Sequence, residues 1–410
     1  MSDKIKILFA PSDLAGVGHF RSIWPAQEIQ RNHRDSFDVK IDVNPNVNDL
    51  EALKKYDIIH FHRHFGPIER LDEIFDTLQS AGVTMIMDID DYWSPPRTHP
   101  MYHAAKNENI AEKITKTLIK ADYVTTTTEY FKKEILKYNK NVIVMPNAID
   151  ANHKMWRQDD SIEKIDKLRV SWIGGSSHLE DLKLLQGSMV RLNSDESIKD
   201  KYQIILCGFD TRGHITEINS NTGEKKTRKI TPQESVWNRF ERIFTSDYKI
   251  VDEGYKKFLD SYKNESYKAN YADLNYIRRW TLPLTQYGKH YNHCDVCLAP
   301  LVKNTFNKVK SELKIIEAGM TKKVLIAQDF GIYKDLIEHG ETGFLVPEVK
   351  NHKDWFKNIK HLINNPEEVD RISNNLHNFV KDRYSLKTAT ENRVESYVRL
   401  HKEKSVLVVN

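Results

Sequence analysis

The strongest constraint on this chain is a pattern that runs twice along it. Short β-rich segments alternate with segments whose apolar residues recur at helical spacing, and the pattern restarts at Arg169–Gly175, "RVSWIGG". Strands that alternate with helices predict a parallel sheet with helices on both faces. Because 410 residues also exceed what one ordinary core supports, we expect two α/β domains, each a Rossmann-like, doubly wound parallel sheet.

Residue type and spacing place the individual elements. In the first half, strands are expected at Ile5–Pro11, Phe37–Ile41, Asp57–His62, Val83–Asp90, Tyr123–Thr128 and Val142–Pro146. Helices are expected between them at Phe20–Arg31, Ile68–Ala81, Ala104–Lys120 and Glu129–Tyr138. After the restart, a helix is expected from about His178, and strands at Gln203–Phe209, Val296–Leu301, Val324–Asp329 and Gly343–Val346.

We expect a first domain over residues 1–160, a second over residues 161–382, and a last helical segment over residues 383–410. Residues 211–279 break the alternation because they form a long, polar, tyrosine-rich stretch. We interpret this stretch as an insertion that starts with a hairpin or a mobile loop. Its basic residues either contact an anionic acceptor or lie in a solvated loop: Lys225, Lys226, Arg228 and Lys229.

The composition excludes some classes of partner. The net charge of +4 is too small to indicate nucleic-acid binding, although it does not exclude a nucleic acid as acceptor. The N-terminus lacks the apolar core of a signal peptide, and no apolar run reaches the roughly 20 residues that a membrane span needs. Three cysteines, an odd number, favour a reducing compartment. We therefore expect a cytoplasmic protein and leave peripheral membrane contact open.

Ligands of parallel α/β sheets bind at the carboxyl ends of the strands. After the first strand, Gly16 and Gly18 allow backbone N–H groups to approach a ligand, although such turns are as often structural. The missing third glycine argues against a dinucleotide fingerprint. His19 and Arg21 follow, and they either face a ligand or cap the turn.

Two further strands of the first half end in ionisable residues. His62, followed by Arg63, closes one of them, and a histidine there either donates to a phosphate or sugar hydroxyl or is a satisfied structural residue. Asp88, Asp90 and Asp91 close the other. Paired acids at a strand end can bind hydroxyls or a metal, and turn capping is the alternative.

Two motifs of the second half raise the question of anions and metals. Gly174, Gly175 and Ser176 follow a strand and precede a helix, which is typical of an anion site but also of simple capping. The stretch His290–Cys297, "HYNHCDVC", has two histidines and a Cys-x-x-Cys. A closed zinc site needs four converging ligands, and Cys297 lies inside an expected strand, so we expect no metal there.

Several motifs, taken in order, resemble the GT-B glycosyltransferases of the retaining family-four type over nearly the whole chain. They are "GVGHFR", "DIIHFH", "VTTTTEYFKKEI", "VIVMPNAID", "WIGG", "LAPL", "IIEAGMTKKVLIAQDFG" and "HGETGFLV". The resemblance implies two Rossmann-like domains that face each other across a cleft, with C-terminal helices that cross back to the first. It also implies a nucleotide-diphosphate sugar as donor and a hydroxyl acceptor, with the donor bound mainly by the second domain.

The resemblance assigns the ribose-binding carboxylate of the family to Glu317. The first glutamate of the family pattern, eight positions earlier, is replaced by Val309. A basic residue that the family carries after "WIGG" is also missing, so we expect Lys310 and Lys314 to offset the charge of the leaving diphosphate. Ordinary solvated lysines are the alternative. Backbone N–H groups around Gly331 are expected to hold phosphate or sugar.

The implied reaction is transfer of a sugar to a hydroxyl with retention, without a metal or another cofactor. Catalytic roles are expected for His62, Lys310 and Lys314, and donor contacts for Gly16, Gly18, Gly174, Gly175, Ser176, Gly331 and Glu317. Contacts to the acceptor or the sugar are expected from His19, Arg21, Arg63, Asp90 and Asp91. The default acceptor is a glycan or a lipid-linked saccharide. The alternatives are a sugar-nucleotide epimerase, a glycosyltransferase acting on DNA or protein, and a non-catalytic protein that binds a nucleotide sugar.

Overall fold

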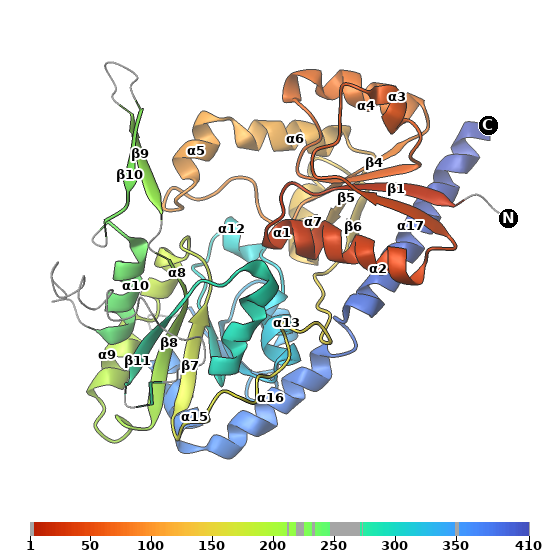
Figure 1. The fold of residues 1–410 in the computed structure, drawn as a ribbon. Coiled ribbons are helices and arrows are strands. Elements are labelled where there is room, and N and C mark those ends of the chain that lie inside the picture. Colours follow the sequence, from red (N-terminus) through yellow and green to blue (C-terminus); the bar gives the residue numbers. More distant parts are fainter. Residues whose placement is uncertain are drawn as a thin grey trace. The chain divides into compact units, whose positions relative to one another are not determined.

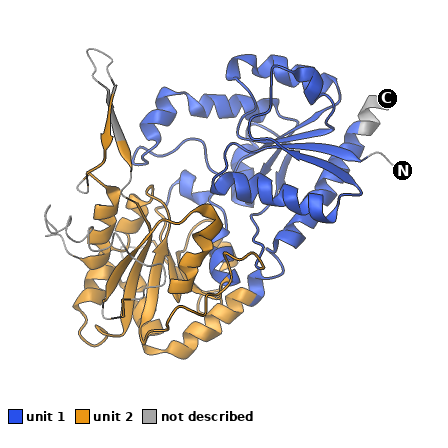
Figure 2. Cartoon of the chain, in the orientation of Figure 1, with its two compact units in different colours: residues 1–151, 303–320, 378–410 blue, residues 152–302, 321–377 orange. Residues whose placement is uncertain are grey.

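The computed structural model describes residues 4–210, 213–218, 225–231, 234–246, 271–272, 274–348 and 352–409. The chain divides into two compact units (Figure 2), residues 1–151, 303–320 and 378–410 in the first and residues 152–302 and 321–377 in the second. Each unit is built on a six-stranded sheet in which all neighbouring strands are parallel. The two doubly wound sheets expected from the sequence are therefore confirmed.

The first sheet has the order β2-β1-β3-β4-β5-β6 (Figure 1). Its strands are β1 (Ile5–Ala10), β2 (Phe37–Ile41), β3 (Ile58–His62), β4 (Thr84–Asp88), β5 (Tyr123–Thr126) and β6 (Val142–Val144). Alternate residues of β1 enter two different apolar clusters, Ile7 and Phe9 on one face and Leu8 on the other. Both faces are therefore covered, which explains why the central strands are apolar runs rather than alternating ones.

Helical segments connect these strands. They are α1 (Gly16–Gly18), η1 (His19–Ile23), α2 (Trp24–Asn32), α3 (Leu50–Leu53), η2 (Ile68–Arg70), α4 (Leu71–Ser80), α5 (Tyr102–Asn107), α6 (Ile110–Lys120) and α7 (Glu129–Ile135). Within the described ranges, no helix combines the length and the apolar character that a membrane span requires.

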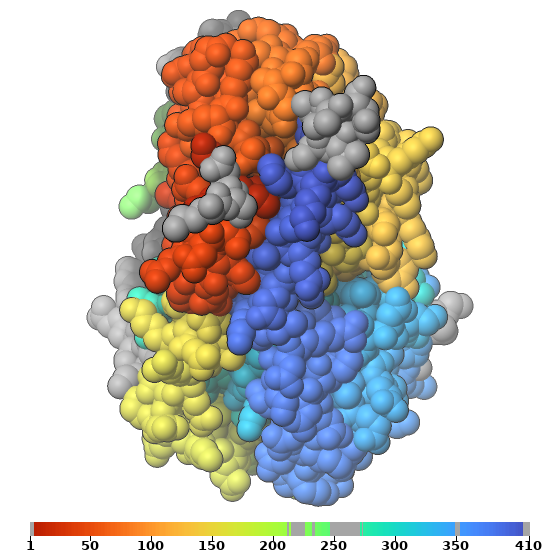
Figure 3. Space-filling model, turned by 90° about the vertical axis from the view of Figure 1, so that its right-hand side faces the viewer, coloured from red at the N-terminus to blue at the C-terminus, as the bar shows by residue number. Residues whose placement is uncertain are grey.

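The C-terminal helix α17, Leu386–Val409, packs on the first sheet beside α2 (Figure 3). Tyr397 is fully buried in the same cluster as Phe9. Arg393, on the same helix, donates a hydrogen bond to the carbonyl oxygen of Arg21. The return of the C-terminal helix to the first domain is therefore confirmed.

The second sheet has the order β11-β8-β7-β12-β13-β14. Its strands are β7 (Leu168–Ile173), β8 (Tyr202–Phe209), β11 (Tyr276–Trp280), β12 (Val296–Ala299), β13 (Val324–Gln328) and β14 (Phe344–Val346). The helices are α8 (Leu179–Lys183), α9 (Gln186–Ser194), α10 (Val236–Thr245), η3 (Leu284–His293), α14 (Ile332–Leu336), α15 (His352–Asn364) and α16 (Pro366–Val380). One apolar cluster joins the strands to α9, α10 and α15.

The insertion expected over residues 211–279 is shorter than predicted. It does start with a hairpin, formed by β9 (His214–Ile218) and β10 (Lys225–Lys229), which pair antiparallel. Its end, however, is β11, an edge strand of the second sheet. The sequence did not predict this strand because two arginines interrupt its apolar pattern. One of them, Arg278, is fully buried and lies 3.3 Å from the equally buried carboxylate of Glu241 on α10. Part of the predicted insertion lies outside the described residues.

The segment over residues 303–320 groups with the first unit, whereas the sequence placed it in the second domain. It contains α12 (Thr305–Lys308) and α13 (Leu313–Met320). Val309, between these helices, is fully buried in the cluster that contains Leu8 and Phe61 of the first sheet. Apolar packing against the first core therefore decides where this segment belongs.

Candidate active site

Polar residues gather in the first unit where β1, β3 and β4 end. Ser12 follows β1, His62 is the last residue of β3, and Asp90 lies just beyond β4. The Ser12 hydroxyl oxygen lies 2.7 Å from His62 Nδ1, and an Asp90 carboxylate oxygen lies 3.0 Å from His62 Nε2. The sequence analysis named His62 and Asp90 but missed Ser12, although its position directly after a strand was an available signal.

The carboxylate of Asp90 is stabilised by its neighbours. Burial favours the neutral acid, but the hydrogen bond from His62 and the positive charge of Arg63 outweigh it and lower the pKa of Asp90 to about 2. The Arg63 guanidinium lies 3.4 Å from Asp90 and 3.7 Å from Asp91. Arg63 adopts a left-handed backbone conformation with φ of 63°, which turns the chain sharply after β3. The structure thus brings these four predicted residues together.

Arg21 is buried and makes internal contacts, which favours a structural role; its contact with a sugar stays a prediction. Its guanidinium donates to both carboxylate oxygens of Asp88 at 3.0 and 2.7 Å. Nη1 donates to the carbonyl oxygen of Met145 and the side-chain oxygen of Asn147. Burial opposes ionisation of Asp88, yet Arg21 holds the pKa of that carboxyl well below its usual range. Asp88 is therefore committed to an internal ion pair rather than to a ligand.

His60 belongs to the same buried layer. Its Nε2 lies 3.1 Å from the hydroxyl oxygen of Thr125, which in turn donates to Asp88 at 2.6 Å. Burial lowers the pKa of His60 to about 3, so this imidazole is neutral at any ordinary pH. His60 is therefore a buried structural residue.

The glycine turn after β1 is explained largely by its own contacts. A Cβ atom on Gly18 would lie 1.9 Å from the carbonyl oxygen of Asp13, so the close backbone approach requires glycine. The Asp13 carboxylate accepts hydrogen bonds from the N–H groups of Ala15 and Gly18 at 2.8 and 3.2 Å. His19 Nδ1 lies 3.0 Å from the carbonyl oxygen of Ala15, so His19 caps the turn. Gly16, in the same turn, stays a predicted donor contact.

The predicted phosphate and ribose residues lie on and before α13. Lys314 Nζ lies 2.7 Å from Glu317 Oε2, and the Glu317 side chain is only 1% exposed. These two residues therefore form one ion pair rather than two independent charges. Lys310 is half-buried, and its Nζ lies 5.0 Å from the ring centre of Phe306, within the range of a cation–π contact.

Glu312, at the start of this segment, faces the core of the first unit. Its carboxylate accepts a hydrogen bond from the backbone N–H of Asn147 at 2.9 Å. Burial raises the pKa of Glu312 to about 7, against the opposing effects of that hydrogen bond and of the positive charge of Arg21. Val309, where the family pattern has its first glutamate, carries no ionisable group, and Glu312 does not replace one because it points inward.

The glycine turn of the second unit follows β7. A Cβ atom on Gly174 would lie 2.6 Å from the Trp172 ring, so this position needs glycine for packing. Gly175 and Ser176 are exposed, and a Cβ atom on Gly175 would meet nothing within 4 Å. Gly331, just before α14, has a φ of 56° and a ψ of −140°, a conformation that favours glycine.

A histidine that the sequence analysis did not single out follows the same turn. His178 Nδ1 lies 2.8 Å from one carboxylate oxygen of Asp181, and the other accepts the backbone N–H of Val302 at 2.8 Å. The side chain of His178 is 26% exposed. The contact with Asp181 fixes the orientation of this imidazole ring. The spacing of three residues between His178 and Asp181 was the signal that could have found this pair.

The stretch "HYNHCDVC" forms part of the second core. Cys294 Sγ lies 3.3 Å from Cys297 Sγ, and both thiols are buried, as are His290 and His293. Cys297 lies in β12, as predicted. Across the described part of the chain, no group of three or more His, Cys, Asp and Glu residues is arranged to hold a metal ion.

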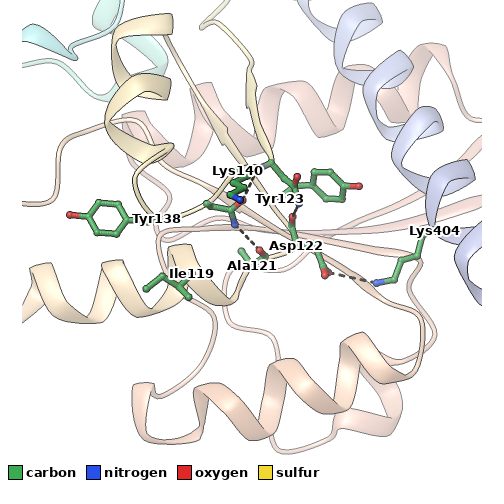
Figure 4. Close-up of a pocket in the computed structure, with 9 residues that line it drawn as sticks. Ile119, Ala121, Asp122, Tyr123, Tyr138, Lys140 and Lys404 are labelled. Carbon is green, nitrogen blue, oxygen red and sulfur yellow. Dashed lines mark hydrogen bonds and ion pairs between the residues drawn. The ribbon is translucent and has the colours of Figure 1, made fainter.

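A separate pocket of about 460 Å³ lies in the first unit at the amino-terminal ends of β5 and β6 (Figure 4). Its lining includes Tyr123, Tyr138 and Lys404. Lys404 Nζ lies 3.6 Å from the Asp122 carboxylate, and burial lowers the pKa of this lysine. Because the strand-end residues described above follow the carboxyl ends of the strands, this pocket is not part of that site.

Comparison with solved structures identifies the fold class as GT-B. The sucrose-phosphate synthase of Thermosynechococcus elongatus is 13% identical, covers 98% of this chain and 100% of its own, and has a TM-score of 0.63. Anabaena Alr3699/HepE, solved with UDP and glucose, is 12% identical, covers 97% of this chain and 100% of its own, and has a TM-score of 0.61. A glycosyltransferase from Rickettsia africae is 12% identical, with coverage of 98% and 99% and a TM-score of 0.59.

A family model adds a sequence match within this fold. Residues 260–365 match the family described as "Glycosyl transferases group 1". No curated protein matches the chain as a whole sequence. The matched residues include Lys310, Lys314 and Glu317, so the resemblance noted from the sequence is confirmed in the segment that carries these three residues.

Proposed function

We propose that this protein is a glycosyltransferase that moves a sugar from a nucleotide-diphosphate sugar to an acceptor hydroxyl. The observation that carries the proposal is the GT-B fold over nearly the whole chain. A structure of Anabaena Alr3699/HepE with UDP-glucose covers 96% of this chain with a TM-score of 0.57. A UDP-sugar is therefore the first donor to test.

Donor contacts are proposed for residues of each unit taken by itself. In the first unit, Glu317 accepts hydrogen bonds from the ribose hydroxyls, and Lys314 pairs with this buried carboxylate at 2.7 Å. Lys310 offsets negative charge on the diphosphate as it leaves. In the second unit, the exposed backbone at Gly175 and Ser176 binds phosphate oxygens. His178, held by Asp181, is proposed to contact phosphate at the place where the family pattern has a basic residue.

The proposed reaction retains the anomeric configuration and uses no metal. The bond between the anomeric carbon and the diphosphate breaks, and a bond from that carbon to the acceptor oxygen forms on the same face. A glycan or a lipid-linked saccharide is the proposed acceptor, bound near His62, Arg63, Asp90 and Asp91 of the first unit. A sugar-nucleotide epimerase would instead return an isomerised donor and need no acceptor.

A ligand screen by thermal unfolding tests the donor class. UDP, UDP-glucose, ADP and GDP are each added to the full chain, because a ligand that binds the folded state raises the unfolding temperature. We expect UDP and UDP-glucose to raise it and product analysis to show sugar release or transfer rather than an isomerised sugar nucleotide. A flat response to all nucleotides would count against any nucleotide-sugar enzyme.

Glu317→Gln tests the proposed ribose contact. The variant keeps the size of the side chain but loses the charge, so we expect UDP binding to weaken about 10- to 100-fold, since hydrogen bonds to a charged group contribute about 1.5–3 kcal/mol. His178→Gln should weaken it in the same direction. Glu395→Gln, at an exposed position of α17, is the matched control. Unchanged UDP affinity in a folded Glu317→Gln variant would refute the assigned role.

A further inference from the structure

The Ser12 hydroxyl is the exposed end of a chain of hydrogen bonds that runs into the first unit. Its oxygen lies 2.7 Å from His62 Nδ1 and 3.0 Å from a carboxylate oxygen of Asp13. The His62 side chain is only 1% exposed, and its Nε2 lies 3.0 Å from Asp90. Since both ring nitrogens are engaged by protein groups, the imidazole reaches solvent through Ser12.

Two proton arrangements satisfy every group of this chain. With a neutral imidazole, Nε2–H donates to the Asp90 carboxylate and Nδ1 accepts the hydrogen of the Ser12 hydroxyl. With an imidazolium, Nδ1–H donates to the Ser12 oxygen, and the hydroxyl donates to Asp13 instead. The Asp13 carboxylate is held in place for this by the N–H groups of Ala15 and Gly18. The two states differ by one proton and the rotation of one hydroxyl.

We propose that Ser12, His62 and Asp90 form a proton relay that accepts the proton of the hydroxyl attacking the sugar. This inference rests on the proposed function. As the new bond to the anomeric carbon forms and the bond to the diphosphate breaks, the acceptor proton moves to the Ser12 oxygen and the Ser12 proton moves to His62 Nδ1. Asp90 balances the charge of the resulting imidazolium. After the products leave, the proton returns through Ser12 to water.

Charges of both signs surround the relay imidazole. Asp88, the last residue of β4, and Asp90, just beyond it, contribute negative charge, and Arg21 pairs with Asp88. Arg63 contributes positive charge, and its guanidinium pairs with the Asp90 carboxylate. The neighbouring His60 and His64 add no competing positive charge near neutral pH, because burial lowers the pKa of each.

The test compares Ser12→Ala with Ser36→Ala. Ser36 is an exposed serine near the opposite end of β1, where its backbone accepts the Ile5 N–H and donates to the carbonyl oxygen of His33. Both variants of the full chain are titrated with UDP and assayed for hydrolysis of UDP-glucose, in which water replaces the acceptor and must lose the same proton. We expect Ser12→Ala to keep UDP affinity and lose about 10²-fold in kcat, the low end for general-base catalysis, with Ser36→Ala unchanged.

A second readout, beside the split between UDP affinity and kcat, separates a relay from a merely structural serine. Residues of one relay act as a unit, so Ser12→Ala combined with Asp90→Asn should be no slower than the slower single variant.

The outcomes are distinct for the relay and for the proposed function. Three results would overturn the relay and leave the glycosyltransferase proposal standing. They are wild-type turnover in Ser12→Ala, multiplied losses in the double variant, and a loss of UDP affinity as large as the loss of kcat. Absence of both nucleotide binding and turnover in the wild-type protein, with UDP-glucose and with other sugar nucleotides, overturns both.

Discussion

Glu312→Gln offers a direct measurement of the cost of a buried carboxylate in this fold. The Glu312 residue is 2% exposed, and burial raises the pKa of its carboxyl from an ordinary value of 4.5 to about 7. The folded chain therefore binds this proton more tightly than the unfolded chain does. The resulting stability is fully present below pH 4.5 and is lost as the pH rises through about 7.

The magnitude follows from the two pKa values. The interval from 4.5 to about 7, at about 1.4 kcal/mol per pH unit, corresponds to about 3 kcal/mol in the free energy of unfolding. Glutamine keeps the oxygen that accepts the Asn147 N–H but cannot ionise. We therefore expect the stability advantage of Glu312→Gln over wild type to grow by about 2–3 kcal/mol between pH 5 and pH 8.5.

Urea unfolding of both proteins over this pH range measures the difference, because all other titrating groups are common to them. Glu395→Gln, an exposed position on α17, should track wild type at every pH. A pH-independent difference would refute the reasoning. So would a Glu312→Gln variant that is less stable than wild type at pH 8.5, because that result would mean that Arg21 stabilises an ionised Glu312.

Two other substitutions test the packing beneath the strand ends. Arg21→Met leaves Asp88 buried without its ion-pair partner and should lower the free energy of unfolding by about 3–5 kcal/mol. Arg31→Met removes an exposed guanidinium whose partner Glu28 keeps a hydrogen bond from Asn32, and it should change the free energy of unfolding by less than about 1 kcal/mol. Equal effects in urea unfolding would contradict the burial argument. Gly18→Ala places a Cβ 1.9 Å from the Asp13 carbonyl oxygen and should lower the free energy of unfolding by about 1–3 kcal/mol. Gly175→Ala is the control: its added Cβ meets nothing within 4 Å, so the thermal midpoint should stay nearly unchanged.

The sequence predicted the two sheets well because nearly all their strands are apolar runs separated by helical patterns. It failed at β11, where Arg278 stands at a position that is fully buried. The sequence alone does not distinguish a buried arginine from a solvated one. Arg278 can be buried because Glu241, on a helix distant in the sequence, lies beside it. The same limit explains the misplacement of residues 303–320, since local periodicity does not say which core an apolar residue such as Val309 enters.

The candidate site was predicted unevenly for a related reason. His62, Arg63, Asp90 and Asp91 were found together because strand ends meet at one edge of a parallel sheet. Ser12 was missed because its position after a strand was its one available signal, and its role depends on a 2.7 Å contact with a residue fifty positions away.

Arg21 shows how one buried residue can imitate a ligand-binding pattern. Its guanidinium donates to Asp88, to the carbonyl oxygen of Met145 and to the side-chain oxygen of Asn147. This fork joins three sequence motifs, and the backbone N–H of Asn147 adds a fourth by donating to Glu312. Lysine cannot replace Arg21 because it lacks the planar set of donors. At the strand ends of the first unit, exposure separates Arg21, which makes internal contacts, from Ser12, which is open to a ligand. By that criterion Ser12 and the exposed turn after β7 are stronger candidates for substrate contact than Arg21, although the arginine stood out more clearly in the sequence.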